Sequence, residues 1–478
     1  SFIGWEEGMP IQHGRISKGI EKAQKKVEER NFEARKSLLE YDEVMDFQRK
    51  HFYASRRKVI EGRDLKESIQ KMIEDMIDGA CENILSPQYP FRCIAEWARG
   101  EFGVELDPKR LVSMDEEMID QDIRERAKRN VSNEISVALG EYLEDYDDPK
   151  TWKIEALVKW AMSAFSVSLS AGKIRKMNAD EIEETLIEAA CEQVDKKDTA
   201  RLVEFLKDDY SLRMFAQWAA SKFDVRLDTA ELEQLKRDQL RQKLTESVRE
   251  KYNRREIEYP VEFAMNMVFG RQEPNVYAFE ALSDWVKKKY QTEMTAEEIQ
   301  NTPPKEIHAK LLELSESWNN GQLLDTVESK IRSANAHELA AWAKERFEAT
   351  LDIDALKSNE TAKDTLLEAG RNYLRRELTD LERYVLLQIY DQAWKDHLYA
   401  MDHLKESIML RAYAEKDPKI EYKHEGHRMF NEMLESIEDR VTDIIFRVRL
   451  EAGQRSRSVY NVSETQHADV NQFEMTQR

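Results

Sequence analysis

The sequence has 478 residues, of which 35% are charged, a mean hydropathy of −0.73 and a formal net charge of −20. With only 15 glycines and 10 prolines, it is expected to be mostly helical and long enough for two to four domains. Apolar runs fall short of the ~18 residues of a membrane span, and no signal peptide is evident. Three scattered cysteines exclude a disulfide framework. Together with the missing signal peptide, they indicate a reducing, cytoplasmic setting. The acidic middle of the chain argues against nucleic acid as its partner.

Residues 14 to about 62 form one helical pattern without a proline. Its apolar stripe runs through Ile16, Ile20, Ala23 and Val27, and then through Ala34, Leu38, Tyr41 and Met45. At 1.5 Å per residue this predicts a helix of roughly 70 Å, which is long for a compact domain. Such a helix is typical of a scaffold along which other parts dock.

Five tryptophans introduce a pattern that recurs between the long helix and residue 380. At +5 comes an aromatic residue, at +7 and +9 mostly apolar residues, and at +10 a small polar residue. We call the five copies leaves 1 to 5. Their tryptophans are Trp97, Trp160, Trp218, Trp285 and Trp342.

Each leaf is predicted to begin with a short amphipathic helix that carries the tryptophan. A brief extended segment then buries the +5, +7 and +9 side chains on one face. The +10 residue is expected to cap a following helix, which an apolar residue near +26 anchors on the same core. The sequence therefore predicts an array of about five similar helical leaves with short extended segments. Packing in these cores is the favoured role for the tryptophans.

Residues 381–449 carry two heptad patterns that run through Leu387, Trp394, Met401 and Ile408, and then through Phe430, Ile437 and Ile444. Two matched apolar seams predict an antiparallel pair of helices. The polar connector between them contains Tyr413, and Asp417-Pro418 prevents the first helix from continuing. Periodicity alone leaves two interpretations open, a projecting lever or two neighbouring helices of a bundle.

Two long motifs resemble the SecA family of bacterial preprotein-translocating ATPases. AQKKVEERNFEARKSLLEYDEV at residues 23–44 is similar to the family's long scaffold helix. WKDHLYAMDHL at 394–404 and LRAYAEKDPK at 410–419 are similar to its two-helix finger. The resemblance implies a scaffold helix over 1–65, an expanded helical wing over 66–380, a finger over 381–450 and a polar tail over 451–478. The tail lacks the Cys-rich zinc motif of many family members.

The resemblance also implies roles for particular residues. At the finger tip, the residues expected to contact the polypeptide are Tyr413, Arg411, Lys416 and Lys419. On the scaffold helix, the residues expected to bind the motor domains are Arg30, Asn31, Arg35, Tyr41, Asp42, Gln48 and Arg49. The implied partners are a SecY-type channel, unfolded preprotein and the motor domains, at the inner face of the plasma membrane.

No nucleotide-binding loop occurs in the sequence. In the resembled family ATP and Mg²⁺ bind to motor domains that precede the scaffold helix, so we expect this segment alone to hold no cofactor and to lack ATPase activity. His424 and His427 have a spacing that suits two metal ligands, but no third ligand is evident. The alternative to a motor component is a freestanding helical-repeat adaptor that binds partners without coupling to a motor.

Overall fold

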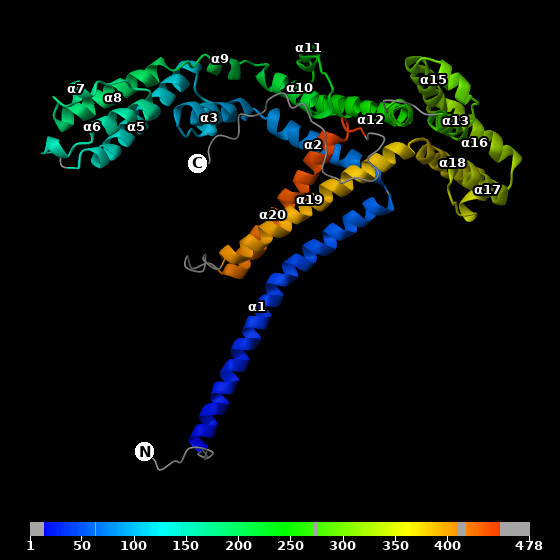
Figure 1. Ribbon diagram of the computed structural model, residues 1–478, viewed down its shortest axis with the longest axis horizontal. Helices are drawn as coiled ribbons and strands as arrows, with labels where there is room; N and C mark the ends of the chain where they lie inside the picture. Colours follow the sequence, from blue (N-terminus) through cyan, green and yellow to red (C-terminus); the bar gives the residue numbers. More distant parts are fainter. Residues whose placement is uncertain are drawn as a thin grey trace. The chain divides into compact units, whose positions relative to one another are not determined.

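A computed structural model of the chain describes residues 14–62, 64–144, 146, 148–270, 276–408 and 417–449. Over these ranges the regular structure is entirely helical, without a strand, which confirms the predicted mainly-α fold (Figure 1). The chain divides into two compact units. Unit 1 comprises Ser1–Ile73 and Arg249–Arg478, and unit 2 comprises Glu74–Val248. The expected wing over 66–380 therefore contributes residues to both units.

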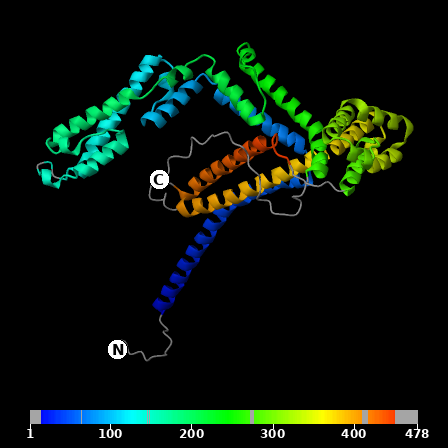
Figure 2. The same ribbon diagram turned by 45° about the horizontal axis from the view of Figure 1, so that its top comes forward.

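Three long helices form the centre of unit 1: α1 (Gly14–Glu61), α19 (Arg376–Ile408) and α20 (Pro418–Ile444). Figures 1 and 2 both show α19 and α20 as an antiparallel pair, with the C-terminal half of α1 beside them. The predicted long helix and two-helix finger are thus confirmed. We call the α19–α20 pair the finger.

The predicted heptad seam of the finger is largely buried. Trp394, Met401 and Ile408 are buried on α19, as are Phe430 and Ile437 on α20. The buried surface is wider than two seams because α1 packs against both finger helices, and this three-helix contact was not expected from periodicity.

Leaves 4 and 5 make up most of the rest of unit 1. Their helices are α13 (Val276–Tyr290), α14 (Ala296–Asn301), α15 (Pro304–Ser317), α16 (Leu323–Ser333), α17 (Ala336–Phe347) and α18 (Asn359–Leu374). A π-helical turn at Trp318–Gln322 joins α15 to α16. One hydrophobic core, including Leu282, Leu311 and Leu366, serves both leaves. These two leaves therefore share a core.

Unit 2 contains leaves 1 and 2 and the start of leaf 3. Its helices are α3 (Tyr89–Phe102), α4 (Pro108–Leu111), α5 (Glu116–Tyr142), α6 (Ile154–Phe165), α7 (Ala171–Ile174), α8 (Ala179–Lys196), α9 (Arg201–Phe205), α10 (Tyr210–Phe223) and α11 (Thr229–Leu232). Two more helices, α2 (Leu65–Ile84) and α12 (Arg237–Phe269), have residues in both units. The long helix α5 supplies Ile123 to the core of leaf 1 and Leu139 to the core of leaf 2.

Every tryptophan helix ends in the same turn. Each tryptophan contacts its +5 aromatic ring edge to face, with ring centroids 5.0–5.5 Å apart. The residue at +6 then has a left-handed backbone with φ between 53° and 65°; these residues are Gly103, Ser166, Asp224, Gln291 and Glu348. In four leaves the N–H at +7 donates to the carbonyl at +1, which is the Schellman pattern that ends a helix.

The segment that follows differs from the sequence-based expectation. The +10 residue precedes a short helical turn, and the long helix starts only after it. Asp107, Asp228 and Thr295 cap the short helices, whereas Ser170 makes no capping bond. The long helices α5 and α8 have their own caps at Asp115 and Asn178. The expectation of a single capped helix after +10 is thereby corrected.

Candidate functional site: the junction between α1 and the finger

An aromatic cluster joins the C-terminal half of α1 to the finger. Phe52 is almost fully buried, and its ring stacks on Trp394 with a centroid distance of 4.5 Å and an interplanar angle of 13°. Tyr390 lies 5.6 Å from the same ring. Nearer the finger tip, Tyr41 contacts Tyr422 edge to face at 4.8 Å. These contacts on both finger helices bury large apolar surfaces and fix α1 against the pair.

Gln48 is the one α1 side chain that hydrogen-bonds to both finger helices among the bonds found for the described residues. Its Nε2 donates to the carbonyl of Gly426 on α20 at 2.8 Å, and its Oε1 lies 2.9 Å from Nε2 of His397 on α19. Gln48 is only 2% exposed. Because the amide oxygen can only accept, His397 must carry its proton on Nε2. Gln48 therefore ties three helices together through one amide group.

Gly426 lets α1 and α20 approach this closely. A Cβ atom at this position would lie 3.0 Å from Cε of Met401 and 3.5 Å from Cγ1 of Val44. Any larger side chain would push against α19 and α1 together. The glycine thus keeps the carbonyl of residue 426 within reach of Gln48.

His397 is held in its neutral form. Burial lowers the pKa of its imidazole to about 4, because charging the ring in this environment is costly. Its ring also lies 5.6 Å from both Trp394 and Phe430. At neutral pH the imidazole therefore acts as a fixed hydrogen-bond donor in an aromatic surround.

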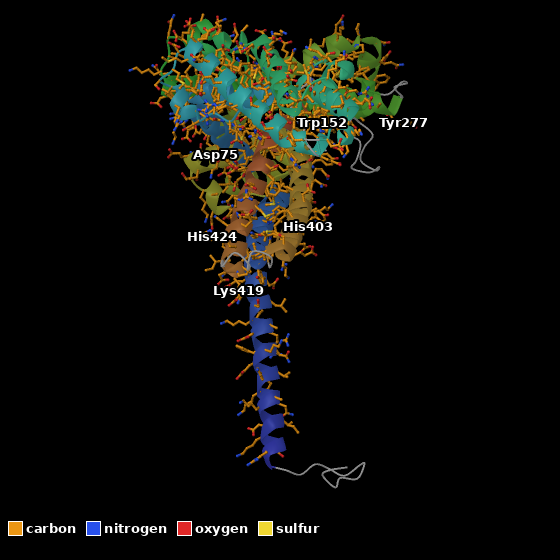
Figure 3. The ribbon with its side chains drawn as sticks, turned by 90° about the vertical axis from the view of Figure 1, so that its left-hand side faces the viewer. Asp75, Trp152, Tyr277, His403, Lys419 and His424 are labelled. Carbon is orange, nitrogen blue, oxygen red and sulfur yellow. The ribbon has the colours of Figure 1, made fainter. Side chains whose placement is uncertain are left out.

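Ion pairs flank the buried contacts between α1 and the finger. Arg56 binds Asp391 through two bonds of 2.6 and 3.1 Å, and this guanidinium lowers the pKa of the Asp391 carboxyl group. Near the tip, Lys419 on α20 pairs with Glu40 on α1, and the ammonium group lowers the pKa of Glu40. Figure 3 labels Lys419 beside α1 at the end of the finger. These pairs align α1 with the finger along its length.

The structure divides the expected docking residues of α1 into two groups. Arg30, Asn31, Arg35, Asp42 and Arg49 are exposed. Tyr41 and Gln48 are buried, and their side chains contact the finger. The docking role of all seven residues stays a prediction.

Of the expected finger-tip residues, Arg411, Tyr413 and Lys416 lie outside the described residues. Lys419 is half-buried in the first turn of α20 and is paired with Glu40. The structure therefore gives Lys419 a contact within the chain, which its sequence position did not suggest.

The N-terminal half of α1 carries several exposed apolar side chains. Ile20, Val27, Phe32 and Leu38 are each more than half exposed. Figure 2 shows this part of the helix extending past the end of the finger within unit 1. Exposed apolar side chains along one helix are typical of a surface that another domain covers.

A buried charged network at the base of the finger was missed from the sequence. Arg375, between α18 and α19, contacts both oxygens of Glu382 at 2.9 and 3.0 Å and donates to the Tyr252 hydroxyl at 3.0 Å. Its Nε also lies 2.9 Å from Glu256, which accepts a bond of 2.9 Å from Lys66. Burial raises the pKa of Glu382, and the guanidinium opposes this shift. The network joins α2, α12 and α19.

A search for metal sites over the described ranges finds no group of three or more ligand side chains. His424 and His427 are both exposed on α20. A search of the described helices for one long and apolar enough to cross a membrane also finds none.

Together these features define an all-helical scaffold protein in which a long helix braces a two-helix finger beside a set of helical leaves. The sequence profile of the SecA Wing and Scaffold domain matches residues 10–136 and 265–449. The chain belongs to the SecA family, of which it contains the wing and scaffold. The stretch between the two matched segments, 137–264, contains leaf 2 and most of leaf 3 and accounts for the expanded wing.

Several curated relatives carry the SecA name. The chain is 32% identical over 495 aligned residues to protein translocase subunit SecA 1 of Rhodopirellula baltica, covering 98% of this chain and 40% of that protein. It is 47% identical over 115 residues to SecA of Desulforamulus reducens, or 22% of this chain and 13% of the relative. It is 57% identical over 76 residues to SecA of Acetivibrio thermocellus, or 16% and 8%. The chain thus spans less than half the length of these relatives.

Proposed function

We propose that this chain is the transmission and polypeptide-contacting part of a SecA-type motor that moves unfolded preproteins through a SecY-type channel. In this proposal ATP and Mg²⁺ bind to motor domains outside this sequence. The scaffold helix carries their movement to the finger, at the inner face of the plasma membrane. The names of the relatives, which are protein translocase subunits, support this role.

The observation that carries the proposal is the rigid fixing of α1 to the finger. Gln48 binds both finger helices, Phe52 stacks on Trp394, and Arg56 pairs with Asp391. A displacement of α1 would therefore move the finger as one body. The exposed apolar side chains on the other half of α1 offer a surface to the motor domains.

The finger tip supplies the contact with the transported polypeptide in this proposal. An aromatic ring with a hydroxyl group, such as Tyr413, can contact varied backbone and side chains without selecting a sequence. The basic residues Arg411, Lys416 and Lys419 would face acidic groups of a channel.

The test joins this chain to motor domains, either those encoded with it or those of the Rhodopirellula relative, and measures preprotein transport into membrane vesicles. Tyr413→Ala should reduce transport at least about tenfold while ATP hydrolysis without preprotein continues. Tyr146→Ala removes an exposed tyrosine of unit 2 and serves as the control. Unimpaired transport by the Tyr413 variant would overturn the role of the tip. Failure of the chain to associate with any motor domain would favour the adaptor function.

A further inference from the structure

A cavity of about 420 Å³ opens in leaf 5, between α18 and the segment that follows α17. Figure 1 shows α17 and α18 beside each other. The volume lies in the range of sites that bind small molecules or individual side chains of a partner. The cavity lies in a different part of unit 1 from the α1–finger junction.

One wall of the cavity is extended backbone. Glu348, Ala349 and Leu351 line it, directly after the left-handed turn at Glu348. Over the parts of the chain that are described, the backbone groups of Thr350 and Leu351 make no hydrogen bond within the protein. Extended backbone with unused donors and acceptors can pair with another extended strand.

The other walls combine apolar surface with an amide. Phe347, Leu351 and Ala369 supply the apolar part, and Phe347 and Ala369 are buried. Asn372 on α18 is exposed at the cavity, and its amide offers both a donor and an acceptor. This combination suits an apolar side chain together with the peptide backbone beside it.

The charge at the cavity mouth is acidic overall. Glu348 and Glu368 carry carboxylates, and Arg376 pairs with Glu348, which leaves Glu368 as the excess charge. A basic residue next to the apolar one would therefore be favoured, and an acidic one disfavoured.

In leaves 1 and 4 a side chain hydrogen-bonds to a carbonyl at the end of the tryptophan helix. Asn130 donates to the carbonyl of Gly103 at 3.0 Å in leaf 1, and Trp318 donates to the carbonyl of Tyr290 at 3.1 Å in leaf 4. Among the described residues, no side chain donates to the corresponding carbonyls of Phe347 and Glu348 in leaf 5. Glu348 and Thr350 at this end of α17 are exposed, so an outside partner can reach it.

We propose that the leaf 5 cavity binds a short extended polypeptide segment in which an apolar side chain stands next to a basic one. The peptide backbone pairs with residues 349–351 and with Asn372. The apolar side chain enters between Phe347 and Ala369, and the basic group lies near Glu368. This site is separate from the finger tip and does not depend on the proposed transport function.

The test measures binding of a fluorescein-labelled peptide of Ser, Leu and Lys to the purified chain by fluorescence anisotropy. Asn372→Ala and Glu368→Lys should each weaken binding at least about tenfold, equivalent to roughly 1.4 kcal/mol. Both residues are exposed, and circular dichroism checks that the variants keep their helices. Glu345→Lys makes the same charge change on the exposed face of α17, outside the cavity lining, and should alter binding less than about twofold.

Two results would overturn the proposal. The first is absence of saturable binding. The second is an equal loss in the Glu345 variant, which would indicate general attraction of a basic peptide to an acidic chain. A photo-crosslinking amino acid at Thr365 should attach the peptide to leaf 5, and exclusive attachment at sites introduced elsewhere would contradict it. Tyr413→Ala should leave this binding unchanged, so a failure of the finger function is distinguished from a failure here.

Discussion

Gln48 and His397 lie 349 positions apart, yet a hydrogen bond of 2.9 Å joins Gln48 Oε1 to His397 Nε2. The same amide group donates to Gly426, so a single side chain joins α1 to both helices of the finger. The strength of this junction can be measured on the isolated chain.

Replacing Gln48 with Leu should weaken the junction without creating a cavity, because the two side chains are similar in size. The change leaves the His397 N–H without a partner in a buried place and removes the second bond to the Gly426 carbonyl, which keeps its backbone bond within α20, at a cost of about 1–3 kcal/mol. Native-state hydrogen exchange of α19 amides near His397 should show the loss. Gln392→Leu alters an exposed glutamine of the same helix and should change exchange by less than about 0.5 kcal/mol. Equal exchange in both variants would contradict the role of Gln48.

The junction should lose stability in acid because of His397. Its folded pKa of about 4 lies below the ordinary value of 6.5, so between these values the unfolded state binds more protons. The contribution of His397 is therefore fully present above about pH 6.5 and declines as the pH falls towards 4. Urea unfolding of unit 1 at several pH values checks this. His397→Gln should flatten the dependence in that window, and an unchanged slope would argue against a neutral buried imidazole.

Two glycines, one inside α3 and one directly after it, should respond oppositely to alanine. Gly103 has φ 65°, and an added Cβ would meet no atom within 4 Å, so Gly103→Ala costs about 1 kcal/mol through backbone strain alone. Gly100 lies inside the helix with equally open surroundings, so Gly100→Ala should stabilise by about 0.5–1 kcal/mol. Thermal unfolding followed by the near-ultraviolet signal of the tryptophans compares the two. Changes of the same sign would contradict the left-handed turn.

The network at the base of the finger should be sensitive to loss of one charge. Glu382→Gln removes the carboxylate that contacts Arg375 through both oxygens and leaves the Glu256 carboxylate as the counter-charge of the buried guanidinium, which costs up to about 3 kcal/mol. Hydrogen exchange at the start of α19 measures the effect. Glu313→Gln, at an exposed position on α15, is the matched control and should have almost no effect.

The sequence predicted those parts of the fold whose apolar residues follow a regular period. The stripe of α1 and the heptads of the finger led to helices close to the observed bounds. The register from Trp97 to Phe102 and Val104 likewise placed buried residues in leaf 1. Helical periodicity predicts the apolar face of a long helix, but not what covers it: on α1 the predicted stripe is buried at Tyr41, whereas Ile20 and Val27 are exposed.

The parts that escaped prediction depend on single residues with ordinary surface chemistry. Gln48 resembles any exposed glutamine until the packing of a distant histidine buries it. The left-handed turn at +6 could not be predicted from the sequence, because only leaf 1 has a glycine there. Gln291 and Glu348 adopt the same backbone conformation although neither residue type favours it. Arg375 lies at the break between α18 and α19, where neither a proline nor a glycine marks the end of a helix. Tertiary contacts decide each of these cases.

The boundaries of the expanded wing fall inside helices. Residue 136, where the first family match ends, lies within α5, and residue 265, where the second begins, lies within α12. The added segment thus departs from helical backbone and returns to helical backbone. Cutting at these two points and joining the ends would splice one helix directly to another, with no loop to redesign. Such a cut would also open the core of leaf 1, because Val194, Leu202 and Phe205 of the added segment are buried in it, so the expansion and leaf 1 form one folding unit.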